Sequence, residues 1–457
     1  MIDAAAAGQI HEASLKLLED PGVRFEHDGV CERLILAGAQ AGAAAQVLRL
    51  PRGLVAECLA AAPKQVHLAD RRSEGRTLSA TSAPRVWSTP GMNFVRRGAC
   101  RLFTSTDMAE YSRLLDRLPH CDGVFGMSMN DVPPPARDAV GLRIMAENTT
   151  KHVRAVCFSP AGADALRRMK DVAEGAWFSI GFTAHGPLRW TNLALEIFTR
   201  TAGAGIPTTI NGEPMAGTSG PVTLAGSAAV GNAEILAGLV VNQLLEPGRG
   251  CIYNLGLAHV FDMRTAIAVT GAPENHLFAQ ISSAMGRFYN LPSCSWVSTE
   301  SMVPDVQAAM EKSIGYCTHM AAGVSLVWGI GQLESELAAC PAQAVIDDEI
   351  IAYVRRLLRG VEVSDAALAV DVTRQVGVAG SFLAHDHTLE NFRGEFFEPA
   401  ISLRRKRQSW EAAGSKPLDE VAEDKVDALL AGERQPCLSD SQSKELRRIE
   451  AKFLKGL

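Results

Sequence analysis

The sequence predicts an α/β fold built on a closed (β/α)8 barrel, the TIM barrel. Continuous apolar runs alternate with helix-length segments between residues 124 and 328, and most of these runs are followed by polar or glycine-rich groups. Apolar strands alternating with helices are typical of a parallel sheet covered on both faces, and this many units favour closure into a barrel. A chain of 457 residues with 47% hydrophobic content can bury such a barrel and carry additions at its ends.

The chain is expected to have three parts: an N-terminal appendage of helices and a small β layer at 1–103, the barrel at 104–400, and a C-terminal helical extension at 401–457. Residues 9–40 and 52–62 show helical spacing of apolar positions, whereas residues 66–103 alternate more like strands. The charged extension suits docking or oligomer contact, and we expect a homo-oligomer.

Seven barrel strands are expected from the apolar runs, at 124–129, 153–158, 178–182, 208–210, 251–255, 295–298 and 324–328. The eighth strand is less distinct, and residues 367–372 are the first candidate for it. The carboxyl ends of barrel strands carry the catalytic groups in such folds. The polar residues that follow these runs should therefore meet at one end of the barrel.

Residues 206–226 form the most distinctive strand-end segment. A short β-branched run leads into a loop rich in glycine and proline, and a long apolar helix follows. Glycine lets the backbone approach a ligand closely, and proline fixes the path of the loop. We expect this loop to form a rigid floor of the site, with Asn211 and Glu213 among its polar groups.

Composition excludes several classes of protein. A net charge of −6 and a pI near 6.0 argue against a nucleic-acid-binding protein, and the basic cluster at 404–407 is too short to change this. The apolar segment 225–245 is interrupted by Asn232 and Glu234, so it is interpreted as a buried core helix and no membrane association is expected.

Ten cysteines without a C-x-x-C pair predict free thiols in a reducing cytoplasm, and no signal peptide is visible. No metal-ligand spacing occurs, and His385 with His387 is interpreted as part of a polar loop, so no metal site is expected. The motifs of dinucleotide sites, P-loops, serine hydrolases and zinc proteases are also missing.

Several strand-end segments together resemble the trimethylamine methyltransferase family. They are Gly-Thr-Ser-Gly-Pro-Val-Thr-Leu-Ala-Gly at 217–226, Asn-Ala-Glu-Ile-Leu-Ala-Gly at 232–238, Asp-Met-Arg-Thr at 262–265, Asp-Val-Gln at 305–307 and His-Glu-Ala-Ser-Leu at 11–15. The resemblance covers nearly the whole chain. It implies a TIM barrel that moves a methyl group from a methylated amine to the reduced cobalt of a corrinoid (cobalamin) carried by a separate, cognate corrinoid protein, with no cofactor bound tightly to the barrel itself.

The founding members of that family contain pyrrolysine, whereas this chain has only standard residues. It therefore resembles the larger branch that demethylates quaternary amines such as glycine betaine. Many relatives have a lysine where this chain has Met302, which removes a cation that could contact a carboxylate or phosphate. The substrate is accordingly expected to differ from theirs.

A quaternary amine leaves as a neutral tertiary amine, so the reaction needs no proton. A carboxylate against the ammonium would stabilise the ground state more than the transition state, so aromatic rings are the better wall. The candidates for this wall are Phe182, Tyr253, Trp296 and Trp328, each of which could instead be barrel packing.

The remaining candidates are polar. Donors to a substrate carboxylate are His185, Asn211, Asn254, His259 and Arg264, and Gln332 lies on the same predicted rim. Glu213 and Glu300 follow strands and could orient the amine or a water, with Asn211 beside them, or they could stabilise loops.

Two other functions are considered. One is a catalytically silent betaine-binding or regulatory barrel. The other is a Schiff-base lyase that uses Lys151, which precedes its strand and so should lie at the wrong end of the barrel.

Overall fold

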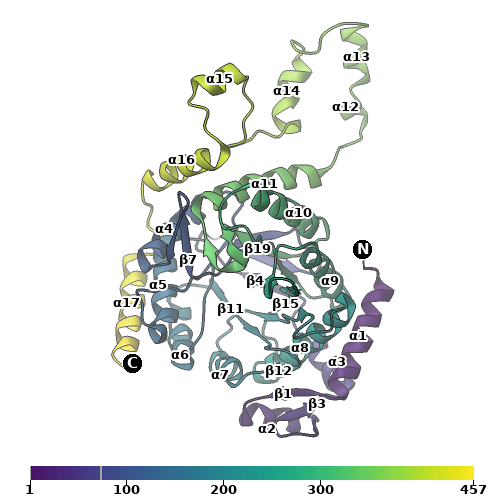
Figure 1. Cartoon of the computed structure of the whole chain (residues 1–457), viewed down its shortest axis with the longest axis vertical. Coiled ribbons are helices and arrows are strands. Elements are labelled where there is room, and N and C mark those ends of the chain that lie inside the picture. The colour runs from purple at the N-terminus through teal and green to yellow at the C-terminus, as the bar shows by residue number, and fades with distance from the viewer. Residues whose placement is uncertain (1, 73–74) are drawn as a thin grey trace.

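The computed structural model describes residues 2–72 and 75–457, and it contains a closed barrel of eight parallel strands (Figure 1). The strands in chain order are β6 (Arg85–Ser88), β9 (Gly123–Phe125), β10 (His152–Arg154), β11 (Phe178–Thr183), β13 (Thr208–Asn211), β15 (Cys251–Gly256), β18 (Ser293–Trp296) and β19 (Leu326–Ile330). The barrel closes where β19 pairs with β6. The expected fold class and all seven expected strands are confirmed.

The prediction of the eighth strand was wrong. Residues 367–372 belong to the short helices α12 (Asp365–Leu368) and α13 (Val370–Val376), and neither helix has a buried residue. The missing strand is β6, which lies inside the segment 1–103 and pairs with both β19 and β9. Three of its four residues are buried, but the strand is short and lies among other short strands in the sequence, so the sequence pattern alone could not separate it from them.

Helices surround the barrel, as parallel strands require. They are α4 (Ser105–Arg117), α5 (Arg137–Asn148), α6 (Pro160–Met169), α7 (Asn192–Thr201), α8 (Leu224–Leu245), α9 (Pro273–Tyr289), α10 (Val306–Ala321) and α11 (Pro341–Arg359). Helix α8 is long and apolar enough to cross a membrane, but 83% of the relevant window is buried inside the fold. The N-terminal helices α1 (Ala4–Glu19) and α3 (Arg52–Ala61) pack against it.

A hairpin closes the amino end of the barrel. Strands β4 (Gln65–Leu68) and β5 (Arg76–Ser79) pair antiparallel, and their side chains Val66, Leu68 and Leu78 join the core inside the barrel. This core also contains Trp87. The amino end is thus filled by packing, and a ligand would enter from the other end.

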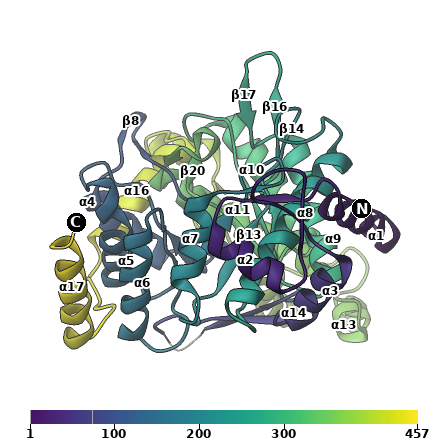
Figure 2. The same cartoon turned by 90° about the horizontal axis from the view of Figure 1, so that it is seen from below.

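The opposite end is the mouth, where the loops after the strands lie. The hairpin of β16 (His259–Asp262) and β17 (Ile267–Val269) rises above it (Figure 2). Beyond α11 the chain extends away from the body as α12, α13 and α14 (Asp386–Glu395), and a loop with α15 (Arg407–Ala412) follows (Figure 1). It then returns as α16 (Leu418–Ala431), against α11 and α4, and α17 (Asp440–Leu454), against α5 and α6.

Candidate active site at the barrel mouth

A cavity of about 180 Å³ lies inside the barrel at the carboxyl ends of its strands. Its lining residues come from all eight strands or from the loops that follow them: Thr89, Pro90, Phe125, Arg154, Ala155, Val156, Cys157, Phe158, Gly181, Thr183, Asn211, Glu213, Leu257, Trp296, Trp328 and Glu336. Catalytic groups occupy this position in (β/α)8 enzymes. The cavity is therefore the candidate active site.

Arg154 is the buried cation of this cavity. The last residue of β10, it is 5% exposed, and no carboxylate of the described residues forms an ion pair with it. Its Nη1 donates to the carbonyl oxygen of Ala155 at 3.2 Å and its Nη2 to Thr209 Oγ1 at 3.0 Å, while its Nε has no partner among the described residues. Burial lowers the pKa of Arg154 to about 9. A buried cation with a free N–H is suited to an anionic ligand group.

Gly181 makes room for this guanidinium. It lies on β11 between Arg154 and Thr209, and a Cβ at this position would stand 1.8 Å from Arg154 Nη2 and 2.2 Å from Thr209 Oγ1. No side chain larger than hydrogen fits there. The orientation of Arg154 thus depends on a glycine in the neighbouring strand.

Aromatic rings form the rest of the inner wall. The Arg154 guanidinium lies 5.1 Å from the ring centre of Phe125 and 5.8 Å from that of Trp328. The indole N–H of Trp328 has no partner in the described part of the chain, whereas the indole N–H of Trp296 donates to Gln332 Oε1. These rings offer both a surface for an alkylammonium group and one further free donor.

A buried ion pair supports the segment that carries Gln332. Lys312 Nζ and Asp347 Oδ2 are 2.7 Å apart and both side chains are fully buried. Lys312 Nζ also donates to the carbonyl oxygens of Gly329 and Gln332, at 2.7 and 3.0 Å. Gln332 was expected to contact substrate, but it lies behind Trp296 and fixes the indole through the side-chain hydrogen bond.

Two carboxyl groups face the cavity, Glu213 from the loop after β13 and Glu336 from the loop after β19. Burial, together with the smaller effect of the nearby carboxylates of Glu336 and Glu234, raises the pKa of Glu213 to about 8. Burial likewise raises the pKa of Glu336 to about 7. The pair therefore retains a proton near neutral pH, because two close carboxylates in a poorly solvated site do not both ionise easily.

Glu336 is presented by a strained turn. Residues Glu334, Ser335 and Glu336 have φ values of 55°, 49° and 85°, a backbone region that favours glycine. Consecutive left-handed residues persist only where surrounding contacts hold them, and such strain is typical of functional sites. The turn therefore holds the Glu336 carboxyl group in one position.

Glu300 is one of the groups that hold this turn. Its carboxylate accepts from the backbone N–H of Thr270 at 2.7 Å and of Gly271 at 2.8 Å, and from Ser335 Oγ at 2.8 Å. Glu300 does not line the cavity. Of the two roles open for it from the sequence, the geometry corresponds to loop stabilisation.

Four of the residues expected from the sequence do line the cavity: Asn211, Glu213, Trp296 and Trp328. Asn254 lies just behind, where its Nδ2 donates to Asn211 Oδ1 at 3.0 Å. Asn211 Nδ2 in turn donates to Thr183 Oγ1 at 3.0 Å. These amides form a short chain across β11, β13 and β15.

Phe182 and Tyr253 point away from the cavity, contrary to the cage expected from the sequence. Side chains alternate between the two faces of a strand, and Gly181 and Thr183 occupy the inner face of β11. Phe182 stacks on Phe198 of α7. Tyr253 donates to Asn232 Oδ1 of α8 at 2.8 Å.

His185, His259 and Arg264 also lie outside the cavity. His185 is exposed after β11, and Arg264 is exposed in the β16–β17 turn. His259 is buried, with its Nδ1 3.0 Å from the Leu257 carbonyl oxygen. His259 and Arg264 belong to the hairpin that rises above the mouth, and His185 is exposed, so following a strand in sequence did not bring these three side chains into the cavity.

Sequence reasoning missed Phe125, Arg154 and Glu336. Arg154 carried a usable signal, since an arginine inside an otherwise apolar strand is seldom fully buried without a purpose. Phe125 looked like ordinary core. Nothing in the neighbouring sequence indicated that Glu336 faces the cavity, because the direction of its side chain depends on the left-handed turn.

The rim around the cavity is apolar and exposed. Phe158, which also lines the cavity, is 65% exposed. Further exposed apolar side chains come from other strand-end loops: Met92, Val222, Met263, Met302 and Leu337. Exposed apolar side chains thus follow several of the strands that line the cavity.

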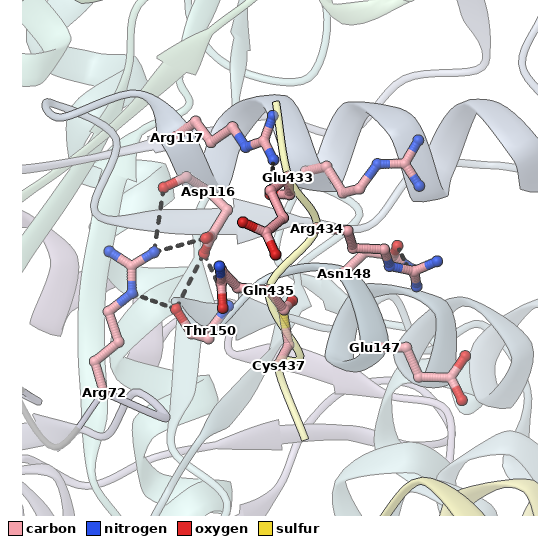
Figure 3. A pocket seen from close by; sticks show the side chains of 11 residues that line it. Arg72, Asp116, Arg117, Glu147, Asn148, Thr150, Glu433, Arg434, Gln435 and Cys437 are labelled. Carbon is pink, nitrogen blue, oxygen red and sulfur yellow. Dashed lines mark hydrogen bonds and ion pairs between the residues drawn. The ribbon is translucent and has the colours of Figure 1, made fainter. Parts of the chain in front are cut away.

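A larger cavity, of about 490 Å³, lies outside the barrel strands, between the carboxyl ends of α4 and α5 and residues 433–437 (Figure 3). Its arginines are used in internal contacts. Arg72 pairs with Asp116 at 2.6 Å, and Arg117 Nη2 donates to the carbonyl oxygens of Gly432 and Glu433 at 3.0 and 2.6 Å. The Arg117 bonds attach the C-terminal segment to α4, so the cavity is interpreted as a structural seam.

Comparison with known proteins agrees with this architecture. A family model described as trimethylamine methyltransferase matches residues 1–453. A trimethylamine methyltransferase of Desulfitobacterium hafniense is 28% identical, covering 96% of this chain and 91% of the relative. A glycine betaine methyltransferase of Desulfitobacterium hafniense strain Y51 is also 28% identical, covering 88% of this chain and 86% of its own.

The solved structures show a similar fold. The crystal structure of the Methanosarcina barkeri monomethylamine methyltransferase aligns over 100% of this chain and 88% of its own with a TM-score of 0.56, at 11% sequence identity. The match of the family model over nearly the full length is decisive for kinship. The chain belongs to the trimethylamine methyltransferase family.

Proposed function

We propose that the protein transfers a methyl group from a zwitterionic quaternary amine, a betaine, to the corrinoid of a separate protein. One observation carries the choice of substrate: a buried Arg154 without an ion-pair partner in the described chain stands beside Trp328 and Phe125. A cavity for a simple cation would not place a permanent positive charge among the rings. A betaine supplies an anion for the arginine and a cation for the remaining wall.

The carboxylate of the substrate would accept from Arg154 Nε and from Trp328 Nε1, the two buried donors of the cavity-lining residues that lack partners in the described part of the chain. Both are buried, so these hydrogen bonds would be strong and directional. The ammonium group would then face Trp296 and the pair Glu213 and Glu336. One substrate would thus satisfy the charges of both ends of the cavity.

The raised pKa values of Glu213 and Glu336 suit this chemistry. A fully ionised pair would hold the ammonium ground state tightly, although the positive charge on nitrogen disappears as the methyl group leaves. A pair that keeps a proton presents less negative charge, and its proton can hydrogen-bond to the departing neutral amine. Glu213 and Glu336 would therefore orient the amine without trapping it.

The mouth fits a bulky methyl acceptor. The apolar rim that includes Phe158 and Met302 could receive the face of a corrinoid and its protein. When bound, the reduced cobalt of a corrinoid would supply the nucleophile for the methyl group. The chain itself binds and orients the substrate so that a methyl group faces the open mouth.

All ten cysteines of the chain are free thiols, which supports action in the reducing cytoplasm. The family kinship supports a cognate corrinoid protein as the partner.

The test mixes the purified protein with chemically reduced cob(I)alamin and a panel of amines, and follows methylcobalamin by its visible spectrum. The panel pairs each betaine with a quaternary amine that lacks the carboxylate, such as tetramethylammonium. Methyl transfer from a betaine supports the proposal. Tight betaine binding without transfer, also with the cognate corrinoid protein, would identify a silent binding protein instead.

A further inference from the structure

Residues 361–399, here called the arm, leave the body of the protein without packing on it. Helices α12, α13 and α14 have no buried residue. In the described part of the chain the arm is attached at its base, where Arg356 Nε and Arg359 Nη2 donate to the carbonyl oxygens of Glu395 and Gly394 at 2.8 and 2.6 Å, and where the Phe397 ring lies 5.3 Å from that of Tyr353. Figure 1 shows the arm projecting beyond α11.

The arm needs a partner surface for two reasons. Helices shorter than about 12 residues are marginal in water unless an apolar face is packed, and the longest arm helix, α14, has 10 residues. The arm also exposes large apolar side chains, with Val378 at 104%, Leu383 at 85% and Leu389 at 68%. Packing within one copy does not supply the missing contacts.

The same chain offers an unpartnered apolar surface on α10. Val306, Met310 and Ile314 follow one another at a spacing of four residues and are 85%, 56% and 51% exposed. The charged side chains of α10 turn elsewhere, since Lys312 is buried and Glu311 accepts from Thr299 Oγ1 at 2.5 Å. An uncharged outer helix face is typical of the centre of a protein interface.

The charge of the arm is opposite to that of a basic segment in the same chain. Residues 361–399 contain seven acidic and two basic residues, whereas the four residues 404–407 are all basic and exposed. Across a two-fold axis every contact between two copies occurs twice, so both arms can face a basic segment of the other copy. One chain therefore supplies both halves of an apolar and an ionic match.

We propose that the arm packs on the α10 face of a second copy of this chain, and that the two copies exchange arms. The methyl acceptor is a poorer occupant, because Figure 2 shows α13 and α14 on the side of the molecule opposite to the β16–β17 hairpin at the mouth. A protein docked at the mouth would not reach them. The inference does not depend on the proposed reaction.

The test measures the mass of the full-length protein by sedimentation velocity, for the natural chain and for Leu383→Asp and Met310→Glu. The natural chain is expected to be a dimer or a closed assembly of dimers, and each variant is expected to dissociate. Both positions are exposed in a single copy, so folding should be unaffected. Leu36→Asp is the matched control, since Leu36 is 89% exposed on α2 (Asp28–Leu36), away from both surfaces, and should leave the assembly intact.

Hydrogen exchange distinguishes the possible occupants. In the natural assembly the amides of α14 should exchange at least about tenfold more slowly than in Met310→Glu, and dilution should remove this protection. A monomeric natural chain, or an assembly that survives both variants, would overturn the proposal. So would protection of α14 that is independent of concentration, which means packing in the same copy, or protection that requires added corrinoid protein.

Discussion

The cavity at the barrel mouth and the cavity beneath residues 433–437 differ in whether their donor groups have hydrogen-bond partners. The cavity beneath residues 433–437 is the larger, about 490 Å³ against about 180 Å³ at the mouth, yet its arginines bond to carboxylates and carbonyl oxygens of the chain. The mouth instead contains Arg154 Nε and Trp328 Nε1, which lack partners among the described residues. Buried polar groups are normally satisfied, so unsatisfied ones locate a site better than empty volume does.

Removing the mouth cation should have the largest effect. Arg154→Leu is expected to lower kcat/KM for a betaine at least about 30-fold, since leaving a buried charge unpaired costs roughly 2–5 kcal/mol. Tetramethylammonium, which has no carboxylate, serves as the control substrate and should be affected much less. Equal losses for both substrates would mean that Arg154 only supports the barrel.

The rings should have a smaller effect. Trp328→Leu and Trp296→Leu are each expected to weaken betaine binding by about 0.5–2 kcal/mol, roughly 2- to 30-fold, measured by calorimetry. Tyr253→Phe is the comparison outside the cavity. It should lower the melting temperature through the lost bond to Asn232 and leave betaine binding unchanged. Unchanged binding in both tryptophan variants would remove the rings from the proposed site.

The carboxyl pair should give the protein a characteristic pH dependence. The pKa of Glu213 is raised to about 8, so the folded state holds this proton more firmly than the unfolded chain does. The associated stability is complete below the ordinary glutamate pKa near 4.5 and is lost as the pH rises through about 8. Glu213→Gln should flatten this decline in melting temperature between pH 5 and pH 9. A decline identical to that of the natural protein would contradict the assignment.

The smallest effect is expected at the cavity beneath residues 433–437. Arg72→Ala should cost at most about 1 kcal/mol of stability, because Arg72 is 44% exposed and its pair with Asp116 is partly screened. Methyl transfer should be unchanged, as measured with the same cob(I)alamin assay. A clear loss of activity would show that this cavity is more than a structural seam.

The fold could be predicted from sequence because buried parallel strands leave continuous apolar runs. Seven strands showed this pattern, whereas β6 did not, since it has only four residues and lies among other short strands in the sequence. The arm residues 367–372 looked strand-like only through their apolar content. The register that closes the barrel is a long-range property, and no local pattern encodes it.

The site was predictable only where a residue sits on the inner face of its strand. Trp296 and Trp328 were found, but Phe182 and Tyr253 were misjudged because the sequence did not show which face of β11 and β15 points inward. A shift of one residue in the register of a strand moves each of its side chains to the opposite face of the sheet. The position of the Glu336 side chain depends on the left-handed backbone of Glu334, Ser335 and Glu336, and none of these residue types predicts that conformation.

The turn at Glu334–Glu336 has a consequence for protein engineering. Glycine adopts the backbone of Ser335 without strain, so Ser335→Gly should be enriched in any library selected for heat resistance alone. The same replacement removes the hydroxyl that Glu300 accepts from and loosens the turn that holds Glu336. Selection on this scaffold therefore has to measure turnover together with thermal stability. Selection for stability alone would favour variants in which the Glu336 carboxyl group is poorly positioned.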